Sequence, residues 1–177
     1  LRRMDQPVKR VMIAGGGNIG MRLARALERG YSVRVIEHNK RRSEFLAAKM
    51  NHALVLNGDA TDEELLEQEN IAEMDLFVAV TNDDENNIMS CLLAKRMGAR
   101  RVVALINRRS YVDLLQSGQV DIAISPAQAT IGMLLAHVRR GDVVAVHSLR
   151  RGAAEALEAV VHGDRESCRV TGRSVQE

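Results

Sequence analysis

Short aliphatic runs recur along the first 125 residues of this 177-residue chain. Runs of this kind are typical of strands that are buried on both faces of a parallel sheet. Successive runs begin about twenty residues or slightly more apart, which leaves room for a helix and two short loops in each interval. The six runs lie at residues 11–14, 33–36, 53–56, 76–80, 102–106 and 122–124.

The intervals between these runs carry helical signals. Ile19, Leu23 and Leu27 share one helical face, and Gly30 is placed to end that helix. We expect Thr61 to cap a short helix, with Glu64 completing a capping box. A third predicted helix has Ile88, Cys91 and Leu92 on its inner face and ends at Gly98. A fourth has Tyr111, Leu114 and Leu115 on its inner face and ends near Gly118. Strands that alternate with helices predict an α/β fold with a doubly wound, six-stranded parallel, Rossmann-like sheet.

The pattern changes after the sixth run. Apolar residues at i, i+3, i+4 and i+7 spacing predict a helix over residues 126–140, either packed on the sheet or crossing onto a partner subunit. We expect a strand over 142–147 and a helix over 150–162 to follow. Because the chain begins with Leu1, we expect it to be a piece of a longer protein. The predicted organisation is a linker at 1–8, the sheet domain at 9–125, a crossover helix at 126–140 and the incomplete start of a small α+β domain at 141–177.

Composition and charge exclude several classes of function. The net charge of +2 is too balanced to indicate a polyanionic partner, and aromatic residues at 2% exclude a stacking platform for single-stranded nucleic acid. Two cysteines give neither a disulfide framework nor metal-ligand spacing, which favours a reducing cytoplasm and no metal site. The longest uncharged run falls short of the roughly 20 apolar residues that a membrane span requires, so we expect no membrane insertion.

A G-x-G-x-x-G sequence joins the first predicted strand to the first predicted helix. We expect Gly15 to form the tight turn, Gly17 to let the backbone approach a pyrophosphate, and Gly20 to let helix and strand pack closely. Backbone N–H groups at the start of the helix, around Asn18 and Ile19, then face the phosphates. A glycine turn without a ligand stays open as an alternative.

Glu37 ends the second predicted strand and is placed to accept both ribose hydroxyls of an adenosine. Its carboxylate repels a 2′-phosphate, which favours NAD over NADP. Arg41 and Arg42 follow nearby, and we expect both to be solvated on the next helix.

Small, polar or charged residues also follow the other predicted strands. Because ligands bind outside the carboxyl ends of strands in open parallel sheets, this convergence indicates a ligand site. Asp59, Thr81 and Asn82 are placed to face the adenine and ribose, and Arg108 or Arg109 to reach phosphate. An ordinary turn or cap remains an alternative for each of them.

The sequence lacks the residues that turnover of a nucleotide requires. The residue four places after Tyr111 is Leu115 rather than Lys, and the five histidines are scattered. We therefore expect a binding protein and no enzyme. The alternatives are the cofactor domain of an NAD-dependent dehydrogenase and a redox-sensing transcription regulator, which would need a basic face and a recognition helix that are not visible.

Four segments together resemble the RCK, or KTN, regulatory domain of the TrkA-N type. They lie at residues 11–20, 57–60, 80–86 and 121–126. More narrowly, nearly the whole chain is similar to the second such domain of the Trk-type potassium-uptake regulatory subunit, and the stretch from Leu149 to Gly152 resembles the start of that family's C-terminal domain.

The resemblance implies a cytoplasmic gating subunit, peripheral to the inner face of the cell membrane, that controls potassium flux through a membrane channel or transporter without turnover. It implies NAD(H) as the ligand, with ATP or ADP in some members, and a homodimer or larger ring formed through residues 126–140. The candidate nucleotide contacts are Gly15, Gly16, Gly17, Asn18, Ile19, Gly20, Glu37, His38, Asp59, Ala60, Thr81, Asn82, Asp83, Arg108 and Arg109.

Overall fold

The computed structural model describes residues 7–108, 110–111, 119–138, 143–149 and 154–159. The chain divides into two compact units, Leu1–Ser125 and Pro126–Glu177. No helix among the described residues is both long enough and apolar enough to cross a membrane.

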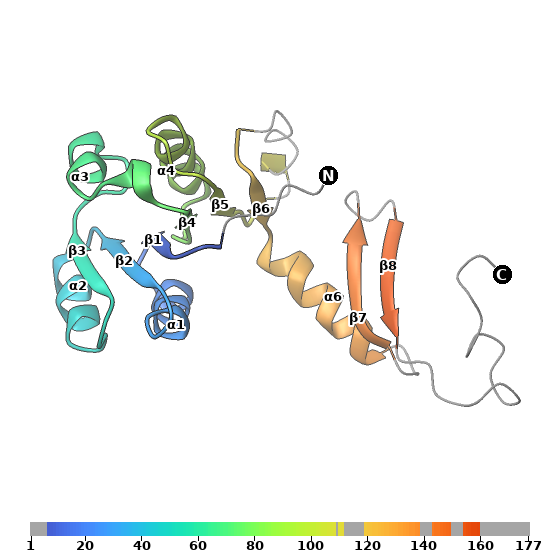
Figure 1. The fold of residues 1–177 in the computed structure, drawn as a ribbon. Helices are drawn as coiled ribbons and strands as arrows, with labels where there is room; N and C mark the ends of the chain where they lie inside the picture. The colour runs from blue at the N-terminus through green and yellow to red at the C-terminus, as the bar shows by residue number, and fades with distance from the viewer. Residues whose placement is uncertain (1–6, 109, 112–118, 139–142, 150–153, 160–177) are drawn as a thin grey trace, which may run out of the picture. The chain divides into compact units, whose positions relative to one another are not determined.

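The first unit is built on a six-stranded sheet whose strands are all parallel (Figure 1). Each of the six predicted runs forms a strand, so the predicted sheet is confirmed. The strand order β3-β2-β1-β4-β5-β6 reverses direction between β1 and β4, which is where doubly wound sheets bind their ligands. The strands are β1 (Arg10–Ala14), β2 (Ser32–Glu37), β3 (Leu54–Asn57), β4 (Leu76–Ala79), β5 (Val102–Leu105) and β6 (Ile122–Ile124).

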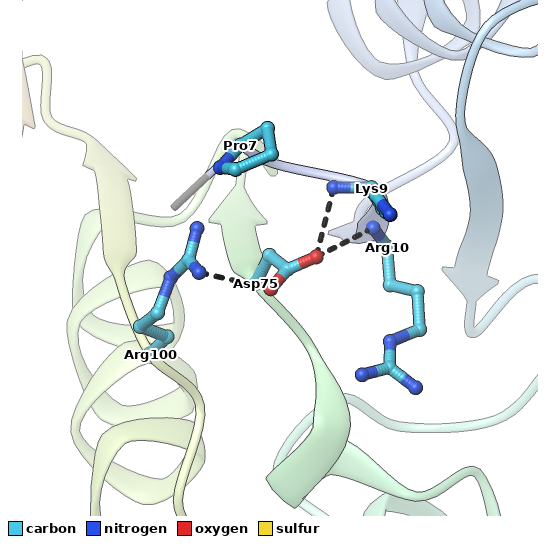
Figure 2. Close-up of a pocket in the computed structure, with 5 residues that line it drawn as sticks. All are labelled: Pro7, Lys9, Arg10, Asp75 and Arg100. Carbon is cyan, nitrogen blue, oxygen red and sulfur yellow. Dashed lines mark hydrogen bonds and ion pairs between the residues drawn. The ribbon is translucent and has the colours of Figure 1, made fainter. Parts of the chain in front are cut away.

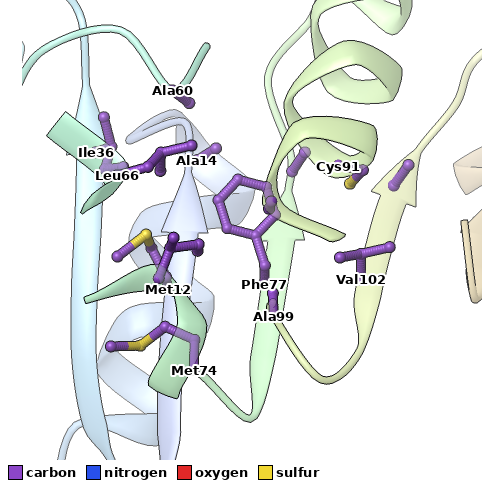
Figure 3. Packing of buried hydrophobic residues seen from close by; sticks show 14 of the residues in the cluster. Met12, Ala14, Ile36, Ala60, Leu66, Met74, Phe77, Cys91, Ala99 and Val102 are labelled. Carbon is purple, nitrogen blue, oxygen red and sulfur yellow. The ribbon is translucent and has the colours of Figure 1, made fainter. Parts of the chain in front are cut away.

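Helices cover both faces of this sheet, α1 and α2 on one face and α3 and α4 on the other (Figure 1). Alternate residues of β1 point to opposite faces, as the period of two requires. Val11 and Ile13 therefore join the cluster that includes Ala24 of α1, whereas Met12 joins the cluster that includes Phe77 and Cys91 of α4 (Figure 3). The helices are α1 (Asn18–Leu27), α2 (Lys40–Ala47), α3 (Glu63–Gln68), the 3-10 helix η1 (Ile71–Glu73) and α4 (Asp84–Arg96).

The ends of these helices differ in part from the predictions. Asp62 caps α3 by accepting from the backbone N–H groups of Glu64 and Leu65, so the prediction that Thr61 forms this cap is wrong. Asp62 stands at the N-cap position, whereas the hydroxyl of Thr61 donates to Asp59. Gly98 ends α4 with φ of 108°, as predicted. The helix expected after Tyr111 lies mostly outside the described residues.

The second unit contains α6 (Pro126–Val138) followed by an antiparallel pair, β7 (Val143–Leu149) and β8 (Ala154–Ala159). The expected helix and first strand are present. The prediction of a helix over 150–162 is wrong where the structure describes it, because β8 is a strand. Its sequence favours a helix, but pairing along β7 satisfies the backbone of both strands, and such tertiary pairing overrides a weak local preference.

Candidate functional site

A pocket of about 280 Å³ lies at the carboxyl ends of β1 to β4. The strand register brings these ends level, because Ala14 pairs with Ile36 on one side and with Ala79 on the other. Most of the lining residues belong to the predicted contacts, and the structure adds Ile36, Gly58 and Asn86. The pocket is lined by Gly15, Ile36, His38, Gly58, Asp59, Ala60, Thr81, Asn82, Asp83 and Asn86.

The glycine turn after β1 reaches this pocket at Gly15. Gly15 has φ of 105°, and a Cβ on it would lie 3.0 Å from the backbone nitrogen of Thr81. A Cβ on Gly20 would lie 1.9 Å from the carbonyl oxygen of Gly15, so only glycine lets α1 approach the turn this closely. A Cβ on Gly17 would meet nothing within 4 Å. The turn is therefore closed at its two outer glycines and open at Gly17, as the motif predicts.

The N-terminus of α1 begins at this open glycine. Gly17 is its cap and provides no side-chain hydrogen bond, whereas Asn39, Asp62 and Asp83 cap α2, α3 and α4 with their side chains. The first backbone bond of the helix runs from the Met21 amide to the Gly17 carbonyl at 2.9 Å. The preceding amides of α1 have no partner within the helix, and with the helix dipole they favour an anion.

Glu37, at the end of β2, is nearly buried and is bonded to the same turn. Its Oε2 accepts from the Gly16 amide at 2.8 Å, and its Oε1 accepts from the Asn39 amide at 2.9 Å. His38 is largely exposed, and its Nδ1 lies 3.2 Å from Oε1. A carboxylate offers about four acceptor positions, so two backbone donors leave capacity for hydroxyl groups.

Arg42 lies against the glycine turn, which corrects the prediction that it is solvated. Its Nε donates to the Gly16 carbonyl at 2.8 Å, and its guanidinium lies over the ring of Phe45 at 5.1 Å. The two residues are 26 positions apart in the sequence, and the packing of α2 against β2 and β3 brings them together. Arg41 is exposed, as expected.

The end of β3 is shaped by an Asx turn. Asp59 Oδ1 accepts from both the amide and the hydroxyl of Thr61 at 2.8 Å. These two bonds, the backbone bond first, hold the pKa of Asp59 below its ordinary value. Asp59 therefore faces the pocket as a carboxylate.

The end of β4 is held by Asn87, a residue that the sequence analysis missed. Its side chain is fully buried. Oδ1 accepts from the amide and the hydroxyl of Thr81 at 2.9 and 2.6 Å, and Nδ2 donates to the carbonyls of Thr81 and Leu105 at 3.1 and 2.8 Å. Both donor positions and both acceptor positions of its side-chain amide are therefore used. The only sequence signal is a polar residue on the inner face of a predicted helix.

The end of β5 lies apart from the pocket lining. Arg108 donates to Glu85 Oε1 and to the Tyr111 hydroxyl, both at 2.9 Å, so its guanidinium is engaged by these two residues. The backbone here is fixed by Asp84, which accepts from the amides of Asn107 and Arg108. Burial alone would raise the pKa of Asp84, but these bonds outweigh it and hold the pKa below its ordinary value. Arg109 lies outside the described residues.

A second pocket, of about 510 Å³, lies at the opposite edge of the sheet, where strands begin (Figure 2). Asp75 accepts there from the amides of Lys9 and Arg10 at 2.8 and 2.9 Å and pairs with Arg100 at 3.3 Å. This carboxylate fixes the entry of the chain into β1, and the pocket contains none of the predicted contacts. Within the part of the chain that the structure describes, no group of acidic, histidine or cysteine side chains could hold a metal ion.

Comparison with known proteins gives a family match over residues 11–126, to the TrkA-N domain. The chain is 59% identical over 175 residues to the Trk system potassium uptake protein TrkA of Halomonas elongata, covering 99% of this chain and 38% of that protein. It is 57% identical to the protein of the same name from Vibrio alginolyticus, with the same coverage. The chain thus spans less than two fifths of the length of these relatives.

Solved structures share the fold. The RCK domain of GsuK matches with a TM-score of 0.60 at 28% identity, covering 75% of this chain and 29% of that one. A GsuK channel bound to NAD matches with a TM-score of 0.64 at 21% identity, covering 82% of this chain and 26% of that one. GsuK bound to ADP matches with a TM-score of 0.60 at 21% identity, covering 68% and 32%. At 21% identity these last two likenesses concern the fold alone.

Proposed function

Because the chain belongs to the TrkA-N domain family, we propose that it binds NAD(H) at the carboxyl edge of its sheet and serves there as a regulatory domain of a potassium-uptake system. One observation carries this proposal. The uncapped N-terminus of α1 opens at Gly17, directly beside a carboxylate, that of Glu37, which is anchored to the same turn.

The residues present fit a nucleotide. The first amides of α1 would bind phosphate oxygens, where a Cβ at position 17 would meet open space. Glu37 would accept ribose hydroxyl groups, and Asp59, Thr81 and Asn82 would line the adenosine side of the pocket. ATP and ADP carry the same adenosine and phosphates and belong to the same proposal. Arg108 would reach a phosphate only after leaving Glu85 and Tyr111.

The domain is proposed to regulate and not to catalyse. The Halomonas and Vibrio relatives are potassium-uptake proteins, which supports such a role, and so does the likeness to a GsuK channel bound to NAD and to GsuK bound to ADP. We place the protein in the cytoplasm, at a membrane transporter or channel partner. Nucleotide would shift the conformational equilibrium of this domain and its partner only by binding the two states with different affinity.

The helix α6 supports assembly with a second copy. Three of its large apolar side chains, Ile131, Met133 and Leu134, are 48%, 68% and 58% exposed. Burying these side chains against another subunit removes them from water, so we propose a homodimer or ring formed through residues 126–140.

Titration calorimetry of the chain with NAD, NADH, ATP and ADP tests the binding step. We expect saturable binding of at least one of these nucleotides, and weaker binding by Glu37→Gln, which lacks the charge that attracts ribose hydroxyls. In vesicles that hold the full-length protein and its membrane partner, nucleotide should change potassium flux without being consumed. Hydride transfer by the full-length protein would instead favour the dehydrogenase alternative.

A further inference from the structure

The middle glycine of the turn, Gly16, is held from three sides by the corner between β2 and α2. Its N–H is bonded to Glu37 Oε2 at 2.8 Å, and its carbonyl accepts from Arg42 Nε at 2.8 Å. A Cβ on Gly16 would lie 2.1 Å from Cδ1 of Leu46, which is fully buried on α2. The motif assigns functions to its other glycines and none to this one.

These contacts fix the orientations of the two peptide groups that flank Gly16, that with Gly15 and that with Gly17. Glu37 accepts from the N–H of the Gly15–Gly16 peptide, and Arg42 donates to the carbonyl of the Gly16–Gly17 peptide, so neither peptide can rotate without breaking a charge-assisted bond. The amides that follow, from Gly17 onward, are then left to face a ligand. A turn already in its binding conformation avoids the cost of being ordered when the ligand arrives.

Further contacts fix the backbone and the side chain of Arg42. Its backbone amide donates to Asn39 Oδ1 at 3.0 Å, which anchors the first turn of α2. Its guanidinium lies over Phe45 at 5.1 Å, and NH2 lies 3.9 Å from the sulfur of Met21 on α1. The side chain therefore joins α2 to the start of α1 and brings the positive charge of its guanidinium beside the turn.

We propose that Arg42 is a positioning residue that holds the glycine turn in the conformation that accepts phosphate, and that it thereby selects nucleotides carrying phosphate over the bare nucleoside. This inference rests on the proposed nucleotide site. Arg42 acts through Gly16 and through its charge, whereas the adenosine side of the pocket is lined by residues that follow β3 and β4.

The test compares ligands with and without phosphate. NAD and ADP are titrated by calorimetry, and adenosine by chemical-shift changes, which detect weak binding. We expect Arg42→Met to bind NAD and ADP about tenfold more weakly, the scale of one lost charge-assisted hydrogen bond, and to bind adenosine unchanged. Arg42→Lys, which keeps the charge and one donor, should recover part of the loss. Arg41→Met, at the exposed neighbouring position, is the matched control and should bind like the wild type.

A second variant keeps the proposal testable if Arg42→Met does not fold. Phe45→Leu removes the ring beneath the guanidinium at a position that is 45% exposed. It should weaken the binding of NAD two- to threefold and leave the binding of adenosine unchanged. Equal losses for adenosine and NAD in the variant that folds, or no loss at all, would overturn the positioning role. Failure of the wild type to bind any nucleotide would instead overturn the proposed function itself.

Discussion

Two buried polar side chains, Asn87 and Glu37, fix loops of the candidate site. Asn87 joins the loop after β4 to the end of β5, and Glu37 joins the end of β2 to the glycine turn. Both lie where a polar group without partners would be costly, so each satisfied bond specifies one loop conformation.

Replacing Asn87 should therefore destabilise the fold. In Asn87→Leu the amide of Thr81 and the carbonyl of Leu105 lose their buried partner, and we expect the free energy of unfolding to fall by about 2 to 4 kcal/mol. Urea denaturation measures this change. Asn86→Leu makes the same substitution at the pocket surface and should cost less than about 1 kcal/mol. Equal effects of the two variants would contradict the role given to Asn87.

Alanine substitutions at Gly17 and Gly20 should have different effects, one mainly on ligand binding and the other mainly on stability. Gly20→Ala places a methyl group 1.9 Å from a carbonyl oxygen, so we expect a loss of about 3 kcal/mol or more in stability. Gly17→Ala meets no protein atom and should cost about 1 kcal/mol or less. Gly17→Ala should nevertheless weaken the binding of NAD, because the methyl group enters the proposed phosphate site. Thermal unfolding and calorimetry, run on both variants, check the two halves of this prediction.

Cys91 should be unreactive while the protein is folded. It is fully buried in the core, and burial raises the pKa of its thiol to about 12. In a Cys168→Ser variant, Cys91 is the remaining thiol of a chain that has two. A thiol reagent at pH 8 should then modify it only as fast as the protein unfolds, because the thiolate is the reactive species. Rapid modification without unfolding would show that the core is open at α4.

At the scale of elements, carboxylates fasten strands and helices to one another. Asp75 holds the start of β1, Asp84 joins α4 to the loop after β5, and Glu28 accepts from the amides of Asn51, His52 and Ala53 before β3. Backbone N–H bonds lower the pKa of Glu28 and of Asp75, and at Asp84 they outweigh the opposing effect of burial.

This network predicts the acid side of the stability profile. A carboxyl group whose pKa is lower in the folded state contributes stability that is present above its unfolded pKa and is lost as the pH falls through its folded pKa. We expect the free energy of unfolding to be level near pH 6 and to decline below about pH 4. Asp84→Asn should be less stable at pH 6 and should decline less steeply. Urea denaturation at pH 6, 4 and 3 measures both slopes, and parallel profiles would contradict this role of Asp84.

Local pattern predicts the elements of the sheet but not the contacts between distant ones. The six aliphatic runs are long enough to be recognised by themselves, and the glycine spacing indicates where the first helix begins. The hydrogen bonds from Arg42 to Gly16 and from Asn87 to Leu105 depend on how α2 and α4 pack. A short stretch of sequence does not contain that information. The strand β8 escaped prediction for the same reason, since its partner β7, not its own sequence, decides its conformation.

At the scale of the whole molecule, the sheet unit carries the proposed nucleotide site and α6 carries the apolar residues proposed for assembly. The chain matches 38% of the length of its Halomonas and Vibrio relatives, so regulation of potassium uptake is a property to be tested in the full-length protein. What this chain can decide by itself is whether nucleotide binds at the glycine turn.

Mapping NAD onto the chain by amide chemical shifts tests that claim most directly. We expect saturable shifts centred on Gly17, Asn18 and Ile19, with smaller shifts along the pocket at Asp59 and Thr81. Saturation with these amides unmoved, or shifts confined to the pocket of Figure 2 at the opposite edge of the sheet, would contradict it.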